Sequence, residues 1–176
     1  MPYDSHSNGA IEVGVRLVRG MFRTLNLCFE ARIGKYIPAA HAITAWLLEH
    51  TCILLNARCR GSDGLTPWQR IKGRSSRQLL LSFGKCILYK LPIKGPGSNP
   101  DGNMGSRWLE GLFLGYSRSS NAYIVATAEG VTTARSLHRR QVENIWSFSK
   151  LSALSATPCS LRGKPVLDVR FQDGEP

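Results

Sequence analysis

Apolar residues in the segment 9–32 recur in steps of four and three. This spacing places them along a single stripe of a helix. The stripe consists of Ile11, Val15, Val18, Phe22, Leu25 and Phe29. Gly14 and Gly20 interrupt the segment, and each weakens a helix by about 1 kcal/mol relative to alanine. The pattern therefore predicts a long amphipathic helix with two weak positions.

Two further segments are predicted to be helical. Residues 39–57 are apolar on nearly all sides, which is typical of a helix buried against a sheet or a partner. Residues 66–73 form a shorter helix in this prediction, because Thr66 can cap its N-terminus and Pro67 suits its first turn.

The pattern changes to short strands after about residue 80. The strand-like segments are 83–92, 107–117, 121–129 and 131–140, with Glu129–Gly130 as a hairpin turn. Short, closely spaced strands favour a small barrel. Residues after 148 are rich in Ser, Pro and Gly and lack periodicity, which predicts a flexible tail. The fold class predicted for the 176 residues is α+β.

The amino-acid composition indicates what kind of partner the chain binds. A hydrophobic content of 43% is normal for a folded protein, and the net charge of +11 favours a polyanionic partner, most often a nucleic acid. The alternative is a solvated basic surface without a specific partner. No apolar run reaches the roughly 18 residues that span a bilayer, so no membrane association is predicted.

The cysteines and histidines point to a compartment rather than to a metal site. The five cysteines are odd in number and none has CxxC spacing. This usage suits a reducing compartment, nuclear or cytoplasmic, and argues against secretion. The four histidines lie near no pair of cysteines with zinc-ligand spacing.

One acid and three arginines form a second stripe on the first predicted helix. Glu12, Arg16, Arg19 and Arg23 lie within about 60° of one another around the helix axis. A carboxylate followed by arginines suits a group that helps to hold a metal beside a phosphate backbone. The simpler alternative is a helix-surface salt bridge between Glu12 and Arg16.

A basic stretch links the helical part to the strands. It contains Arg58, Arg60, Arg70, Lys72, Arg74, Arg77, Lys85, Lys90 and Lys94, against the single acid Asp63. Such a stretch can contact phosphates with little sequence preference, or it can be a solvated linker. The residues predicted to contact DNA here are Arg70, Lys72, Arg74 and Arg77.

Five short motifs, taken together, resemble the integrase of copia-type retrotransposons. Each is weak alone, but they occur in the family's order over roughly residues 5–146. They are Ser-Asn-Gly-Ala-Ile-Glu (7–12), Trp46-Leu47-Leu48 with Leu54-Leu55-Asn56, Thr66-Pro67-Trp68-Gln69-Arg70, Phe83-Gly84-Lys85, and Glu110-Gly111-Leu112-Phe113-Leu114-Gly115-Tyr116. Gln69 stands where the family usually has an acid, and Val13-Gly14 replace residues that are usually polar.

The resemblance implies a fold and a site. The fold would be the C-terminal helices of an RNase H-like core (1–75), an SH3-like β-domain (76–147) and a flexible tail (148–176). Glu12 would match the third acid of an Asp–Asp–Glu triad, a ligand of magnesium or manganese. Arg16 and Arg19 would match positions that face double-stranded DNA, and helix 39–57 would form a homo-oligomer.

The resemblance also implies that catalysis is lost in this chain. Strand transfer in the family uses two metal ions roughly 3.5–4 Å apart, and one carboxylate cannot hold both. Asp4 is the only acid before Glu12 and lies on the same short segment. We therefore expect an integrase-derived, DNA-binding chain that binds no metal and catalyses no strand transfer. The alternatives are a non-catalytic basic module that binds nucleic acid in its own right and a protein-interaction module.

Overall fold

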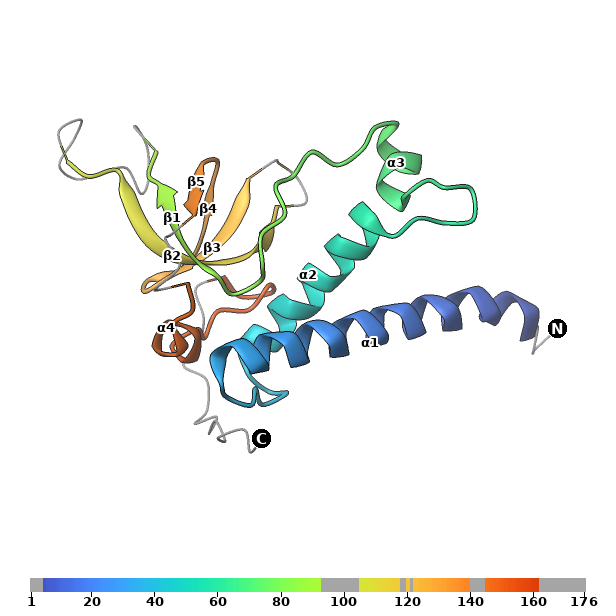
Figure 1. Ribbon diagram of the computed structural model, residues 1–176, viewed down its shortest axis with the longest axis horizontal. Helices are drawn as coiled ribbons and strands as arrows, with labels where there is room; N and C mark the ends of the chain where they lie inside the picture. Colours follow the sequence, from blue (N-terminus) through green and yellow to red (C-terminus); the bar gives the residue numbers. More distant parts are fainter. Residues whose placement is uncertain (1–4, 93–104, 118–119, 121, 140–144, 162–176) are drawn as a thin grey trace.

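The computed structural model describes residues 5–92, 105–117, 120, 122–139 and 145–161. Three helices come first: α1 (Ser5–Ile33), α2 (Ala42–Arg58) and α3 (Pro67–Lys72). Five strands follow: β1 (Cys86–Lys90), β2 (Trp108–Tyr116), β3 (Tyr123–Thr127), β4 (Gly130–Ala134) and β5 (Leu137–Arg139). A short helix, α4 (Phe148–Ser152), comes last (Figure 1). The α+β class is confirmed, and none of the described helices is long and apolar enough to cross a membrane.

Local signals set the ends of the two shorter helices in the N-terminal part. Thr66 caps α3 and forms a capping box with Gln69, and Pro67 occupies the first turn, so this prediction is confirmed. Gly73 ends α3 in the left-handed conformation, with φ of 67°. His41 caps α2 by accepting a hydrogen bond from the backbone N–H of Ile43. Burial lowers the pKa of His41, which favours the neutral ring that can accept this bond.

The strands form one antiparallel sheet in the order β4-β3-β2-β1-β5. The prediction of a single strand over 131–140 is wrong, because the chain leaves β3 after Ala134 and joins the opposite edge as β5. The tight turn lies at Ala128 and Glu129, and Gly130 begins β4 with φ of 135°. Closure of the sheet into an SH3-like barrel stays a prediction.

Helices and sheet share one apolar core. Phe29 of α1, Trp46 and Leu47 of α2, and Leu112 and Leu114 of β2 belong to the same buried cluster. The predicted border near residue 75 therefore does not divide the core. Figure 1 shows the C-terminal end of α1 meeting the N-terminal part of α2 next to the sheet.

Helix α2 is buried within the chain. Ile43, Trp46, Leu47 and Thr51 are all at most 2% exposed, and they face α1 and the sheet. The prediction of burial against a sheet is confirmed. The apolar side on which a homo-oligomer through 39–57 would depend is thus used internally, and the oligomer stays a prediction.

Phe29 of α1 packs tightly against Gly84, just before the first strand. A Cβ atom on Gly84 would lie 2.3 Å from the Cε2 atom of Phe29, so only glycine admits the ring at this distance. Gly84 also has φ of 72°, a backbone conformation that residues other than glycine rarely adopt. The rings of Phe83 and Trp146 contact Phe29 edge to face, with centroids 5.3 and 6.0 Å away.

The prediction of a flexible tail from residue 148 is wrong for residues 148–161. Leu151, Leu154 and Ala156 are buried in the shared core. The indole Nε1 of Trp46 donates a hydrogen bond of 2.7 Å to the carbonyl of Ala156. Leu151, Leu154 and Ala156 are too irregularly spaced to show a helical or strand period. In the structure they pack in the same buried cluster as Trp46 of α2. Residues 162–176 lie outside the described residues.

His50 is a titratable group enclosed by aromatic rings. It is 2% exposed, and its ring centroid lies 5.5–6.3 Å from those of Phe83, Phe113 and Tyr116. Burial lowers the pKa of His50 to about 4, because the charged ring would lose its hydration. His50 is therefore neutral at pH 7 and is part of the core.

The contact at Gly84 gives the first testable prediction. We expect Gly84→Ala to lower the free energy of unfolding by more than about 2 kcal/mol, because it adds backbone strain and a clash with Phe29. Gly20→Ala is the control: it lies in α1 with open space around its Cβ and should stabilise by about 1 kcal/mol. Urea denaturation measures both, and equal effects would contradict the contact.

Candidate nucleic-acid interface

Helix α1 is held to the molecule by its C-terminal half alone. Phe22, Leu25 and Phe29 pack against the core, whereas Ile11 and Val15, on the same stripe, are 67% and 44% exposed. Figure 1 shows why: α2 diverges from α1, so the N-terminal half of α1 extends away from the other elements. The predicted amphipathic stripe is confirmed, but only its C-terminal half is buried.

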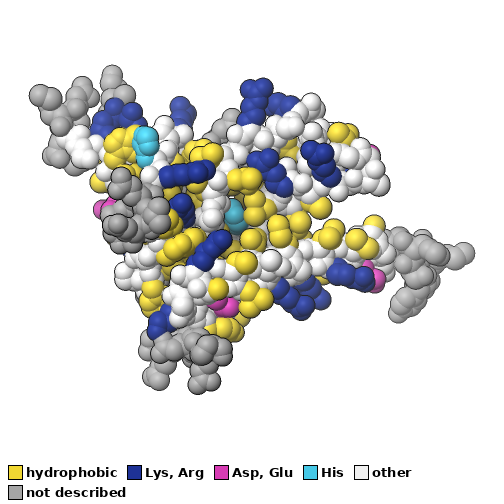
Figure 2. Space-filling view, in the orientation of Figure 1, with side chains coloured by type: hydrophobic (Ala, Val, Ile, Leu, Met, Phe, Trp, Pro, Cys, Tyr) yellow, Lys and Arg dark blue, Asp and Glu magenta, His cyan; other side chains and the backbone are white. Residues whose placement is uncertain are grey.

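The structure brings the predicted basic stripe together on this projecting half. Glu12, Arg16, Arg19 and Arg23 are exposed and line one shallow depression along α1. Figure 2 shows Lys and Arg side chains along one edge of α1 and apolar side chains along the edge that faces α3. In the part of the chain that the structure describes, no ion pair involves these four residues. The alternative of a Glu12–Arg16 salt bridge is therefore not observed.

By the resemblance, Glu12 would match a ligand of the family's metal ions. Among the described residues, no group of three or more His, Cys, Asp or Glu side chains is placed to hold a metal ion. Magnesium needs several oxygen ligands in near-octahedral geometry, and the described surroundings of Glu12 provide its carboxylate alone. These residues do not fit the two-metal centre of the resembled family.

Arg70 is engaged in a specific ion pair. Its Nη2 and Nε atoms donate hydrogen bonds of 2.7 and 3.0 Å to the two carboxylate oxygens of Asp63. The hydrogen bond from Arg70 is the largest of several causes that lower the pKa of Asp63 to about 2. The predicted phosphate contact of Arg70 would compete with this pair, which instead shapes the loop before α3.

The remaining cations of the basic stretch serve different roles. Lys72, Arg74 and Arg77 are exposed at and after the end of α3, and no ion pair of the described residues involves them. In contrast, Arg58 donates a hydrogen bond to the carbonyl of Gln78, and Lys90 lies 5.7 Å from the ring centroid of Trp108.

The basic residues therefore do not form one continuous track. Figure 2 shows Lys and Arg side chains around α3, separated from those of α1 by the opening between the two helices. Lys94, the last cation of the predicted stretch, lies outside the described residues. The residues predicted to contact DNA thus lie in two places, the α1 face and the region at and after α3.

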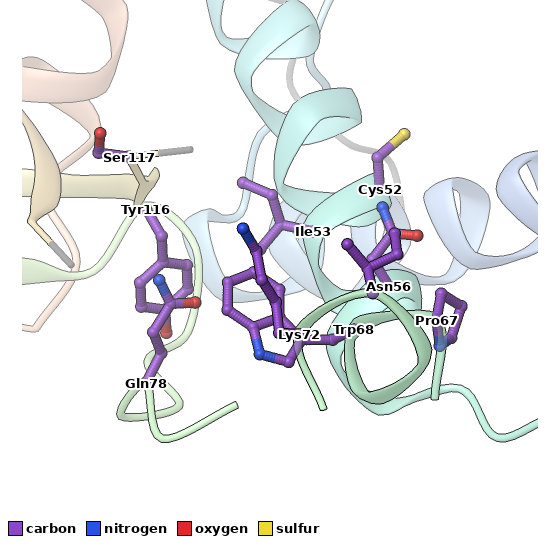
Figure 3. A pocket seen from close by; sticks show the side chains of 10 residues that line it. Cys52, Ile53, Asn56, Pro67, Trp68, Lys72, Gln78, Tyr116 and Ser117 are labelled. Atoms are coloured by element: carbon purple, nitrogen blue, oxygen red, sulfur yellow. The ribbon is translucent and has the colours of Figure 1, made fainter. Parts of the chain in front are cut away.

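A cavity of about 330 Å³ lies between α2, α3 and the end of β2. Figure 3 shows the Trp68 indole between α2 on one side and Tyr116 and Gln78 on the other. Trp68 also lines a second cavity, of about 250 Å³, together with Ser76 and the two exposed arginines that follow α3. Sequence reasoning selected neither Trp68 nor Ser76. The available signal was an indole N–H donor a few residues before a run of basic and hydroxyl side chains.

The motifs that carry the resemblance fall at element boundaries and in the core. Residues 7–12 lie in α1, the Trp46 and Leu54 motifs lie in α2, and the Thr66 motif caps and opens α3. Phe83-Gly84-Lys85 directly precedes β1, and residues 110–116 lie in β2. The chain has no match among protein-family models, curated proteins or solved structures.

The Arg70–Asp63 pair gives a prediction about acidity. We expect the side-chain carboxyl of Asp63 to titrate with a pKa of about 2 when followed by NMR. Arg70→Gln removes the donating guanidinium and should raise this pKa towards its usual 3.8. Arg60→Gln removes a nearby exposed charge that makes no ion pair with the described residues, and should leave it nearly unchanged. A carboxyl that already titrates near 3.8 in the unsubstituted chain would show that the pair does not form in solution.

Proposed function

We propose that this chain binds double-stranded DNA through the basic face of α1, and that it derives from the integrase of a copia-type retrotransposon. The observation that carries the binding proposal is the exposed row of Arg16, Arg19 and Arg23 on a projecting helix, with no ion pair to the described residues. The ancestry rests on the five motifs in the family's order.

The spacing of the arginines suits a phosphate backbone. Arg16 and Arg23 are seven residues apart, or about 10 Å along the helix axis at 1.5 Å per residue. One strand of DNA presents a phosphate about every 3.4 Å of the duplex axis, so the row spans about three base-pair steps. The planar guanidinium can donate two hydrogen bonds to phosphate oxygens. These contacts are to the backbone and favour binding without strong sequence preference.

Metal-dependent strand transfer is not part of this proposal. Glu12 matches the family's third catalytic acid in the resemblance, and it begins the same row as the arginines. A single carboxylate supplies too few ligands for two magnesium or manganese ions. In this chain Glu12 instead places a negative charge beside the proposed phosphate contacts and limits their strength.

A protein-interaction module is the second candidate function, because α1 also exposes apolar side chains. Ile11, Val13 and Leu17 are 67%, 53% and 51% exposed. At 100° per residue, Val13 and Leu17 lie on one side of the basic row, and Ile11 and Val15 lie on the other. Exposed apolar side chains are typical of an interaction site when they gather on one surface. A duplex would cover the basic row, whereas a protein partner would cover one of these apolar sides.

DNA binding is tested by a salt series with a short duplex. We expect affinity to fall steeply with salt, because each neutralised phosphate releases counterions. Replacing Arg16, Arg19 and Arg23 with glutamine should reduce the slope of log K against log salt by about 2.7, which is about 0.9 for each lost phosphate contact.

The control removes the same charge from the sheet region. It carries glutamine at Lys85, Lys90 and Arg135. We expect this variant to keep most of the salt slope, because these cations lie outside the row formed by Arg16, Arg19 and Arg23. Equal losses in both variants would show that only net charge matters, and absence of binding at low salt would overturn the proposal.

A further inference from the structure

The cavity of about 250 Å³ at the end of α3 has buried hydrogen-bonding atoms in its walls. Trp68 Nε1 and Ser76 Oγ are inaccessible to solvent and have no hydrogen-bond partner among the described residues. A buried polar group without a partner is costly, and such groups are uncommon in folded proteins. Both residues line this cavity, and a small turn of either side chain would let its unpartnered donor meet a ligand that accepts hydrogen bonds.

Positive charge surrounds the same cavity. Arg74 and Arg77 line it, both are exposed, and neither forms an ion pair with the described residues. Exposed arginine side chains can turn to admit an anion and then close on it. The cavity thus combines two neutral donors with two guanidinium groups and includes no acidic residue in its lining.

The backbone that carries these groups is fixed on both sides. Gly73 turns the chain after α3 through its left-handed conformation, and Gln69 donates a hydrogen bond of 3.0 Å to the Ser75 hydroxyl. Beyond the cavity, Arg58 holds the carbonyl of Gln78, and the Tyr116 hydroxyl donates to the carbonyl of Leu79. The donors are therefore held by contacts that do not involve the ligand.

We propose that this cavity is a binding site for a phosphate group. Phosphate offers several acceptor oxygens, enough for Trp68, Ser76 and the two arginines at once, and arginine forks match its geometry. A cavity of 250 Å³ exceeds the space of one water, about 30 Å³, by enough to hold the group. The site itself does not depend on the proposed function. Only the source of the phosphate does: if the chain binds DNA, the phosphate belongs to the DNA backbone.

The test follows the indole N–H resonances of the full chain by NMR while inorganic phosphate is added at constant ionic strength. We expect the Trp68 resonance, assigned by its loss in Trp68→Phe, to move, while those of Trp46, Trp108 and Trp146 stay in place. Ser76→Ala should weaken phosphate binding roughly ten-fold, because one hydrogen bond to a charged group is lost. The double variant Arg74→Gln, Arg77→Gln should abolish the response.

Chloride at the same ionic strength is the control titrant, and Ser152→Ala is the matched control for Ser76→Ala, since Ser152 lies in α4 and does not line the cavity. A Trp68 resonance that moves equally with chloride would overturn the proposal. So would a response that survives in the arginine double variant.

Two further arms separate the sources of the phosphate. The variant with glutamine at Arg16, Arg19 and Arg23 should keep the response to inorganic phosphate while losing duplex binding. A shift of Trp68 with the duplex supports the DNA backbone as the source. A shift with phosphate but not with a bound duplex supports the site and identifies a free phosphate compound as its ligand. If no duplex binds at all, the proposed function fails while the phosphate titration still decides this site.

Discussion

The seating of the Phe29 ring against Gly84 is the contact on which the arrangement of the molecule depends. The ring occupies the space that any Cβ at position 84 would fill, and Phe83 and Trp146 enclose it from the sides. This contact joins the C-terminal part of α1 to the residues that lead into β1. Because a helix is stiff over its length, the N-terminal half then projects away from the sheet (Figure 1). The exposed basic face of α1 is therefore a consequence of where the helix is anchored.

The pairing of each arginine decides what it can do. Arg70 is held by both oxygens of Asp63, and Arg58 holds the carbonyl of Gln78, so both shape the backbone around α3. Arg16, Arg19 and Arg23 have no such partner among the described residues. An exposed cation without a partner contributes little to the free energy of folding. Its charge remains available to attract the phosphates of a nucleic acid. The same residue type thus serves the fold near α3 and the proposed binding on α1.

The sequence predicted features that depend on near neighbours and missed those that depend on distant ones. The period of α1 and the cap at Thr66 are local, and both appear in the structure. The burial of Leu151 and Leu154 depends on a surface of α2 about a hundred residues earlier, so composition alone indicated a tail. The break between β4 and β5 depends on which edge of the sheet each strand joins. The unpaired donors of Trp68 and Ser76 become visible only when burial and hydrogen bonds are known.

The central claim is that the face of α1 bearing Arg16, Arg19 and Arg23 binds a phosphate backbone, while the C-terminal half of the helix remains an anchor. Hydrogen exchange of the full chain, with and without a duplex, tests it most directly. Before DNA is added, amides of residues 8–20 should exchange faster than those of 22–33, because only the second group is packed on the core. With a duplex bound, residues 12–23 should gain protection while β2 remains unchanged. Binding that protects the sheet and leaves α1 exchanging as before would contradict this account.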